Sequence, residues 1–232
     1  MYRHGGHSRT YHNKSSHHGG HAMGKVRFVH NVAGGPKVNI SVDGNEVLSD
    51  IPYKAVSPYL KVPVGDRNIK VIATVSGAVL QNLIVGVNNG KYTAIVHGSL
   101  NESQNHPINT VILTDDSTCP QGNNSHVRFV HADGDAPAVD VLVDGQVAFR
   151  NVQYGETGNP EYAPVPAGLH RLSVNLAGTN TEVLGLDDVP LEAGQIYSIF
   201  ATGIPGSDKY PLGALLETDS SSMCMMHHHW KY

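Results

Sequence analysis

Apolar and polar residues alternate along the middle of the chain with a period of two. Val26 and Phe28 alternate with Arg27, and the same pattern runs through residues 38–42. Successive side chains of a β-strand point to opposite faces, so this period predicts strands with one face in a core. Asp-Gly at residues 43–44 suits a two-residue hairpin turn, because Gly accepts a positive φ. Short strands separated by turns, without an amphipathic helix of useful length, predict an all-β sandwich fold.

The pattern occurs twice. Residues 26–30 and residues 127–131 have the same sequence, VRFVH. Further segments match at a nearly constant offset, namely 38–44 with 139–145, 62–65 with 165–168 and 92–98 with 197–203. A repeat of about a hundred residues is a whole small domain, because solenoid units span only roughly 20–50 residues. We therefore predict two tandem sandwiches, and chemistry that belongs to the shared fold should appear in both.

The composition along the chain predicts five zones. The two ends are polar, rich in His and without apolar periodicity, so we expect both to be flexible. The predicted zones are a disordered His- and Gly-rich tail (1–24), β-sandwich repeat 1 (25–116), a linker (117–125), β-sandwich repeat 2 (126–219) and a Cys-, Met- and His-rich tail (220–232).

The second copy carries a family resemblance. Residues 127–145 have the sequence VRFVHADGDAPAVDVLVDG, and PAG at 166–168 and LEAGQIY at 191–197 follow. These segments resemble the domain-of-unknown-function family four-three-nine-seven. The first copy is similar but looser, because GGP at 34–36 replaces the DAP element. The resemblance implies tandem immunoglobulin-like antiparallel β-sandwiches on surface or exported proteins, and it implies no reaction.

Charge and hydropathy exclude several classes of partner. The chain has 232 residues and a formal net charge of −4, so it offers no global attraction to nucleic acid. No apolar run approaches the roughly 18 residues that a membrane span requires. Residues 1–24 contain no apolar segment typical of a secretory signal, so we expect no classical signal peptide in this chain.

The usual catalytic constellations are missing from the sequence. There is no His-Glu-x-x-His metal motif, no Gly-x-Ser-x-Gly elbow and no phosphate-binding Gly-rich loop. The fragment HGS at 97–99 has the counterpart TG at 202–203, so the two copies disagree there. We therefore predict that the protein is not an enzyme.

Two pairs of polar residues occur in both copies. His30 and His131 could form a ligand or pH-sensing site, but we favour histidines that bond a backbone carbonyl and fix the following loop. Arg27 and Arg128 could serve surface recognition, but we favour arginines that pack outward over the sheet.

The two tails carry the candidate metal ligands. Imidazoles suit Zn²⁺, Ni²⁺ and Cu²⁺, whereas thiolate and thioether groups suit Cu⁺. The spacing is irregular, so we expect at most weak binding of Zn, Ni or Cu and no required cofactor; flexible solubilising tails are the alternative. The candidate ligands are His4, His7, His12, His17, His18, His21, Cys224, His227, His228 and His229.

The two cysteines follow the last predicted strand of each repeat. Cys119 and Cys224 thus lie at equivalent places, just after the last strand of two similar domains. We expect these two places to be too far apart for a disulfide bond. An intermolecular disulfide or two free thiols is therefore at least as well supported as an intramolecular disulfide.

Four tyrosines occupy equivalent positions near the loops in the middle of each repeat. Tyr53, Tyr59, Tyr154 and Tyr162 could stack on sugar rings as ligand-binding residues. The alternative, which we favour, is that they fill the ends of the sandwiches with the hydroxyl in water.

We expect a non-catalytic structural or adhesion protein of a surface layer or assembly, similar to a spore coat, exosporium or virion component. It would lie at the surface of a cell, spore or virion. Its partners would be further copies of itself or other surface-layer proteins, contacted through edge strands and tails. The alternatives are an extracellular-type carbohydrate-binding module and a metal-binding protein that acts through its His-rich tails.

Overall fold

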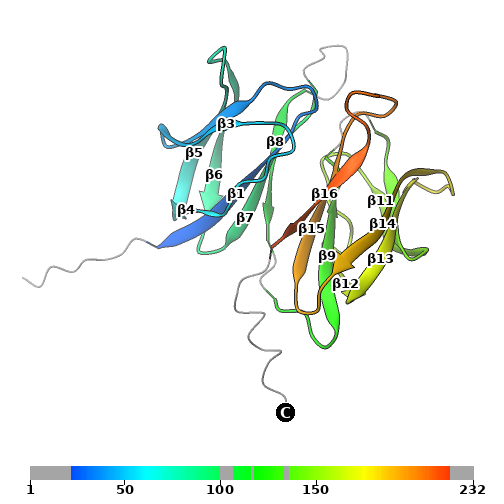
Figure 1. Cartoon of the computed structure of the whole chain (residues 1–232). Helices are drawn as coiled ribbons and strands as arrows, with labels where there is room; N and C mark the ends of the chain where they lie inside the picture. The colour runs from blue at the N-terminus through cyan, green and yellow to red at the C-terminus, as the bar shows by residue number, and fades with distance from the viewer. Residues whose placement is uncertain (1–21, 100–106, 116–117, 133–135, 220–232) are drawn as a thin grey trace, which may run out of the picture.

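All regular elements in the part of the chain that the structure describes are β-strands. The computed structural model describes residues 22–99, 107–115, 118–132 and 136–219. In these ranges sixteen strands form four sheets of four strands each, which confirms the all-β prediction. The sheets are grouped into two sandwich-like units, one for each repeat (Figure 1). No helix in the described ranges is long and apolar enough to cross a bilayer.

The first sandwich contains eight strands in two sheets, ordered β4-β1-β7-β8 and β3-β2-β5-β6. Its strands are β1 (Met23–Asn31), β2 (Val38–Val42), β3 (Asn45–Ile51), β4 (Leu60–Pro63), β5 (Gly65–Ala73), β6 (Val79–Val87), β7 (Lys91–His97) and β8 (Asn109–Thr114). The predicted hairpin turn joins β2 to β3, where Asp43 has a φ of 51° and Gly44 a φ of 81°. β1 begins inside the stretch that the sequence assigns to the N-terminal tail.

The second sandwich repeats the first strand for strand, with sheets ordered β12-β9-β15-β16 and β11-β10-β13-β14. Its strands are β9 (Asn124–Val130), β10 (Val139–Val143), β11 (Gln146–Val152), β12 (Ala163–Pro166), β13 (Gly168–Leu176), β14 (Glu182–Leu191), β15 (Ile196–Thr202) and β16 (Gly213–Thr218). The tandem duplication inferred from the sequence is therefore a duplication of the whole topology.

The sheets are not purely antiparallel. β1 pairs with β7 in parallel, and β9 pairs with β15 in the same way, whereas the other strand pairs are antiparallel. Parallel neighbours need a long crossover connection, and the five intervening strands supply one in each domain. The prediction of antiparallel sandwiches is therefore correct except for the central pair of one sheet in each domain.

Each sandwich has its own apolar core between its two sheets. In the first core, Phe28 comes from one sheet and Ile40 from the other, and valines pack around them. In the second core, Phe129 and Val141 occupy the equivalent places. Phe149, which is buried on β11, adds bulk to the second core. The alternating residues of the sequence pattern thus form these two cores, as expected for a half-buried strand.

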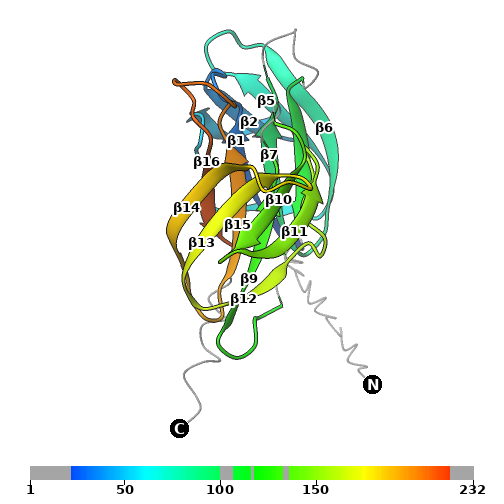
Figure 2. The same ribbon diagram turned by 90° about the vertical axis from the view of Figure 1, so that its right-hand side faces the viewer.

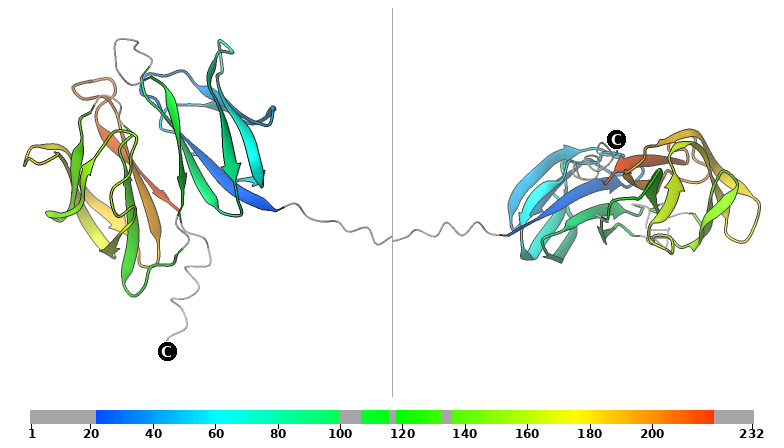
Figure 3. Two further views of the ribbon diagram at one scale, coloured as in Figure 1. Left: turned by 180° about the vertical axis from the view of Figure 1, so that it is seen from behind. Right: turned by 90° about the horizontal axis from the view of Figure 1, so that it is seen from below.

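A third apolar cluster lies between the sandwiches. It joins Val29 and Ile95 of the first domain to Val130, Ala132 and Phe200 of the second, and all five are buried. The outer face of the sheet that contains β1 and β7 therefore packs against the outer face of the sheet that contains β9 and β15 (Figures 1 and 2). These four strands are consequently buried on both faces, although the sequence pattern predicts one exposed face. The same side-by-side packing is visible from behind and from below (Figure 3).

We predict that Phe129→Ala lowers the free energy of unfolding by about 3–5 kcal/mol, because it removes a fully buried ring and leaves a cavity. Urea denaturation followed by circular dichroism measures this loss. Val75→Ala is the matched control, since Val75 is 95% exposed and its truncation should leave the midpoint unchanged. Equal shifts for the two variants would contradict the core assignment.

Candidate functional site

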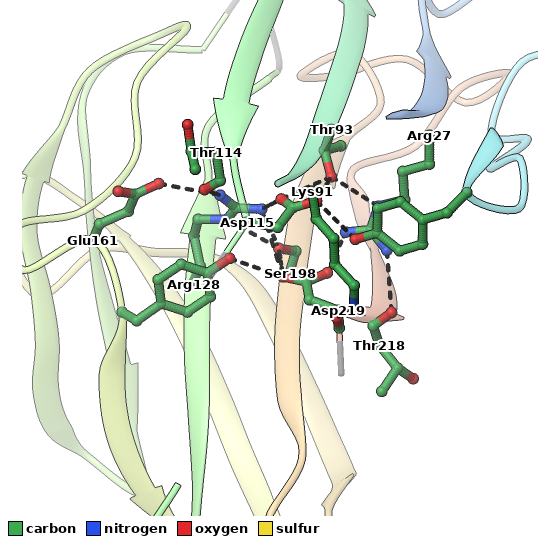
Figure 4. Close-up of polar contacts among 12 residues, drawn as sticks. Arg27, Lys91, Thr93, Thr114, Asp115, Arg128, Glu161, Ser198, Thr218 and Asp219 are labelled. Atoms are coloured by element: carbon green, nitrogen blue, oxygen red, sulfur yellow. Dashed lines mark hydrogen bonds and ion pairs between the residues drawn. The ribbon is translucent and has the colours of Figure 1, made fainter. Parts of the chain in front are cut away.

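The interface between the sandwiches contains a buried network of charged residues. Arg27 on β1 and Arg128 on β9 point into it, and their side chains are 2% and 0% exposed. Their partners are Asp115 and Asp219, which directly follow β8 and β16 and are also buried. Figure 4 shows these four residues converging from both domains.

The charges are exchanged between the two domains. Arg27 of the first sandwich pairs with Asp219 of the second. Arg128 of the second sandwich pairs with Asp115 of the first, with Nη2 and Oδ1 2.5 Å apart. Arg128 also lies 3.5 Å from Oδ2 of Asp219, so the two pairs touch. Each domain therefore supplies the cation for the other domain's anion, as in the isologous interface of a twofold dimer.

The hydrogen bonds around each arginine repeat this relation. Arg27 Nε donates to Thr93 Oγ1 at 2.8 Å, and Nη1 donates to the Thr218 carbonyl at 3.2 Å. In the second domain Arg128 Nε donates to Ser198 Oγ at 3.0 Å, and Nη1 donates to the Thr114 carbonyl at 3.1 Å. Buried charges are tolerated when such bonds satisfy their polar atoms, and here they do so twice.

Two tyrosines close the network over the arginines. Tyr59 Oη donates to Asp115 at 2.7 Å, and Tyr162 Oη donates to Asp219 at 2.9 Å. The guanidinium carbon of Arg27 lies 5.0 Å from the centre of the Tyr59 ring, and that of Arg128 lies 4.8 Å from the Tyr162 ring. These are cation–π distances, so each tyrosine contacts the arginine and the aspartate of its own domain, and these two residues belong to different exchanged pairs.

Burial controls the electrostatics of this site. It raises the pKa of Asp219, and the charge of Arg27 partly offsets this effect. It also raises the pKa of the Tyr59 hydroxyl, and the nearby Asp115 carboxylate raises it further. The same burial lowers the pKa of Lys91, whose Nζ donates to the Asp219 carbonyl at 2.5 Å. Tyr59 thus remains a hydrogen-bond donor over the whole physiological range.

The other pair of predicted tyrosines lies at a different place in the same interface. Tyr53 Oη is 2.6 Å from Thr202 Oγ1 of the second domain, and Tyr154 Oη is 2.6 Å from His97 Nδ1 of the first. All four tyrosines that the sequence offers as sugar-binding residues therefore make polar contacts in this interface through their hydroxyls. The favoured expectation, that these hydroxyls lie in water at the ends of the sandwiches, is therefore wrong. A role in stacking on sugar rings stays a prediction.

The prediction for Arg27 and Arg128 is wrong in its favoured form. The sequence favours arginines that pack outward over a solvent-facing sheet, but each arginine is buried where the other sandwich packs against its sheet. Two signals in the sequence could have indicated this: the arginine occurs at the same strand position in both copies, and the last strand of both copies ends in Thr followed by Asp. An ion pair between equivalent residues of two copies is compatible with both signals.

The expected distance between the two strand exits is also wrong. Because Arg128 contacts both Asp115 and Asp219, the ends of β8 and β16 converge at the interface. Cys119 is disulfide-bonded within the single chain, which differs from the expectation of free thiols or pairing between chains. Cys224, the chain's only other cysteine, lies outside the described residues.

The shared histidines behave as the favoured interpretation predicts. His30 Nε2 donates to the Pro36 carbonyl at 2.8 Å, and His131 Nε2 lies 2.9 Å from the Pro137 carbonyl. His30 Nδ1 accepts a weaker bond from the Val32 amide at 3.4 Å. One ring nitrogen that donates and one that accepts define a neutral imidazole, and burial lowers the pKa of His30 accordingly.

The predicted metal ligands cannot be placed. His4, His7, His12, His17, His18, His21, Cys224, His227, His228 and His229 all lie outside the described residues. Within the described ranges no group of three or more His, Cys, Asp or Glu side chains could hold a metal ion. Weak binding of Zn, Ni or Cu by the tails stays a prediction.

A groove of about 390 Å³ opens in the second sandwich between β14 and the sheet of β15 and β16. Its wall is mostly apolar and includes Leu186, Ile199 and Leu216. Asp187 and Asp188 supply its acidic groups. A groove with apolar walls and a few polar groups could hold a small ligand.

The chain belongs to the family described as Domain of unknown function (DUF4397), whose pattern matches residues 24–142 and 125–223. The tandem pair expected from the sequence is confirmed by these two matches. No curated protein matches the chain. Among solved structures, the chain is similar to "Crystal structure of CBMbc (family CBM26) from Eubacterium rectale Amy13K in Complex with Maltoheptaose". The identity is 8%, the TM-score is 0.22, and the match covers 86% of this chain and 98% of the other. A likeness of this size carries no argument about function.

We predict that Arg128→Ala lowers the free energy of unfolding by about 3–5 kcal/mol, because it leaves Asp115 buried without its ion-pair partner. Arg171→Ala is the control. Arg171 also contacts two carboxylates, those of Glu182 and Asp187, but it is 46% exposed, so its removal should cost much less than that of Arg128. Denaturant unfolding of both variants measures the difference, and similar losses would show that the buried network contributes no more than a surface pair.

We also predict that His30 makes the fold less stable in mild acid. Its pKa is lowered in the folded state, so between pH ~6.5 and the lower folded value only the unfolded chain binds the proton, and stability falls as the pH falls. His30→Gln keeps a donor for the Pro36 carbonyl but cannot titrate. Melting temperatures measured from pH 7.5 to 5 should fall less steeply for the variant, and parallel curves would contradict the assignment.

Proposed function

We propose that the protein is a non-catalytic structural or adhesion component of a surface layer or other assembly, and that its two sandwiches act as one stiff body. The observation that supports this best is the exchange of buried arginine–aspartate pairs between the domains. Separating the domains would leave four charges without partners, and breaking a buried pair costs about 3–5 kcal/mol. A stiff body with reciprocal internal contacts transmits force between its ends, which a structural element requires.

The partners that we propose are further copies of the chain or other surface-layer proteins. Every sheet ends in edge strands, and edge strands offer unpaired backbone groups to a neighbouring chain. We place the protein at the surface of a cell, spore or virion, similar to a spore coat or exosporium component. We also infer an immunoglobulin-like class for each sandwich, supported by the packing of two mainly antiparallel sheets around one core.

A second candidate function is a carbohydrate- or other ligand-binding module. The groove between β14 and β16 favours it, because its apolar wall and the carboxylates of Asp187 and Asp188 could orient a small polar ligand. The third candidate, metal binding by the tails, depends on residues outside the described ranges. We favour the structural role because the residues shared by both copies are used in the interface rather than in a pocket.

We predict that the full-length chain forms ordered oligomers, fibres or sheets. Sedimentation velocity over a range of protein concentrations, followed by negative-stain microscopy of reduced and oxidised samples, tests this. Uniform monomers under all of these conditions, together with selective binding on a glycan array, would replace the structural proposal by the binding module.

A further inference from the structure

Along residues 81–87, the edge strand β6 of the first sandwich lacks the usual protection against pairing with another chain, and its one register shift lies near its start, at Leu80. It is the last strand of its sheet and pairs only with β5. Its nine residues, VLQNLIVGV, include no charge and no proline. Ile84 and Val79 are 65% and 55% exposed. A long, uncharged edge strand with exposed apolar residues is a template for another strand.

The equivalent strand of the second sandwich is protected. In the first domain, Asn68 of β5 lies opposite Ile84 of β6. In the second, the register skips between His170 and Leu172, so that two residues of β14, Asp187 and Asp188, lie opposite Arg171. Two acids at a β-bulge therefore occupy the place of Ile84, and Asp188 has a φ of 56°. Charges and bulges are common devices for blocking an edge.

β14 has two further charged or rigid residues that β6 lacks. Pro190, which cannot donate a backbone hydrogen bond, stands where β6 has Gly86. Glu182 opens the strand, where it forms a surface ion pair with Arg171. The two copies of one fold therefore differ in a specific way: the β14 edge is blocked, and the β6 edge is open.

We propose that β6 pairs with β6 of a second copy of this chain, in antiparallel orientation about a twofold axis near Leu83. Asn82 of each chain would then lie opposite Ile84 of the other, and the two four-stranded sheets would join into one sheet of eight strands. This inference deepens the proposed structural role and rests on it, because it names the partner and the contact surface of the first assembly step.

The charge pattern selects a second copy as the partner. In an antiparallel pairing of a strand with itself, a charge close to the twofold axis lies near its own copy, which is repulsive. β6 has no charge to repel itself, whereas the edge strands β3, β4, β11, β14 and β16 each carry charge of one sign. The uncharged edge strands β8 and β12 have only six and four residues, and β12 contains two prolines.

β6 is also held in place for pairing. The side chain of Gln81 donates to the Ile108 carbonyl at 2.6 Å, which ties β6 to the chain just before β8 in the opposite sheet. Val85 and Val87 anchor the other half of the strand in the core. A strand that is already ordered loses little conformational entropy when a second strand binds to its edge.

Two variants of the full-length chain test this pairing. Ile84→Asp places an acidic side chain on β6 where β14 has Asp187 and Asp188. Ile84→Lys introduces the opposite charge at the same position. Leu169→Asp is the matched control, since Leu169 is 68% exposed but lies on the central strand β13. All three substitutions are at exposed sites, so melting temperatures close to that of the wild type should confirm folding.

We expect the wild type to form dimers in sedimentation velocity and both Ile84 variants to dissociate at least about tenfold more readily, a change of about 1.4 kcal/mol. Leu169→Asp should dimerise like the wild type. Hydrogen exchange of the wild type should slow with increasing concentration in residues 79–87.

Three results would overturn the pairing. Dimers that persist in both Ile84 variants would place the contact elsewhere and leave the proposed structural role intact. Wild-type chains that stay monomeric and never assemble would remove both proposals. Heterogeneous aggregates that bind thioflavin, in place of a dimer, would show that the segment stacks as cross-β rather than closing about a twofold axis.

Discussion

The exchange of buried charges between the two sandwiches is the interaction on which the arrangement of the molecule depends. Arg27 reaches Asp219, and Arg128 reaches Asp115, so neither domain can satisfy its arginine alone. Removing a charge from water is costly unless its partners are present with good geometry. The two domains therefore stabilise each other, and their relative position is defined by hydrogen bonds rather than by a linker.

This arrangement has the form of a homodimer within one chain. The contacts of one domain are repeated by the other with the roles exchanged, as Tyr59 on Asp115 and Tyr162 on Asp219 show. The apolar cluster of Val29, Ile95, Val130 and Phe200 lies on the same four strands as the polar network, and both are buried in the interface. Buried apolar area provides affinity, and the paired charges define the register. Two contacts break this symmetry: Lys91 donates to the Asp219 carbonyl, and Glu161 pairs with Arg128.

Much of the fold could be predicted from the sequence. The period of two located the strands, Asp-Gly marked the β2–β3 turn, and the repeat established two equivalent domains. The parallel pairing of β1 with β7 was not predicted, because strand order depends on contacts between distant segments. The same limitation explains the arginines. A charge in an alternating strand predicts an exposed face, and only a second domain can turn that face into an interior.

The candidate site could be predicted only in its components. Arg27, Arg128, Tyr59 and Tyr162 were identified because both copies carry them, but the pairing between domains follows from packing that no local pattern encodes. In the sequence, the aspartates after β8 and β16 are only two of several polar residues that follow the last strand of each repeat. The unequal edges β6 and β14 show the opposite case. The difference in charge between these two strands can be read from the sequence once the strand register aligns Ile84 with Asp187 and Asp188.

Differential scanning calorimetry of the full-length chain tests most directly whether the two sandwiches form one body. If the exchanged ion pairs couple them, the chain should unfold in one transition whose calorimetric and van't Hoff enthalpies agree. Two resolved transitions, or a van't Hoff enthalpy near half the calorimetric value, would show that the domains unfold independently and would contradict the account.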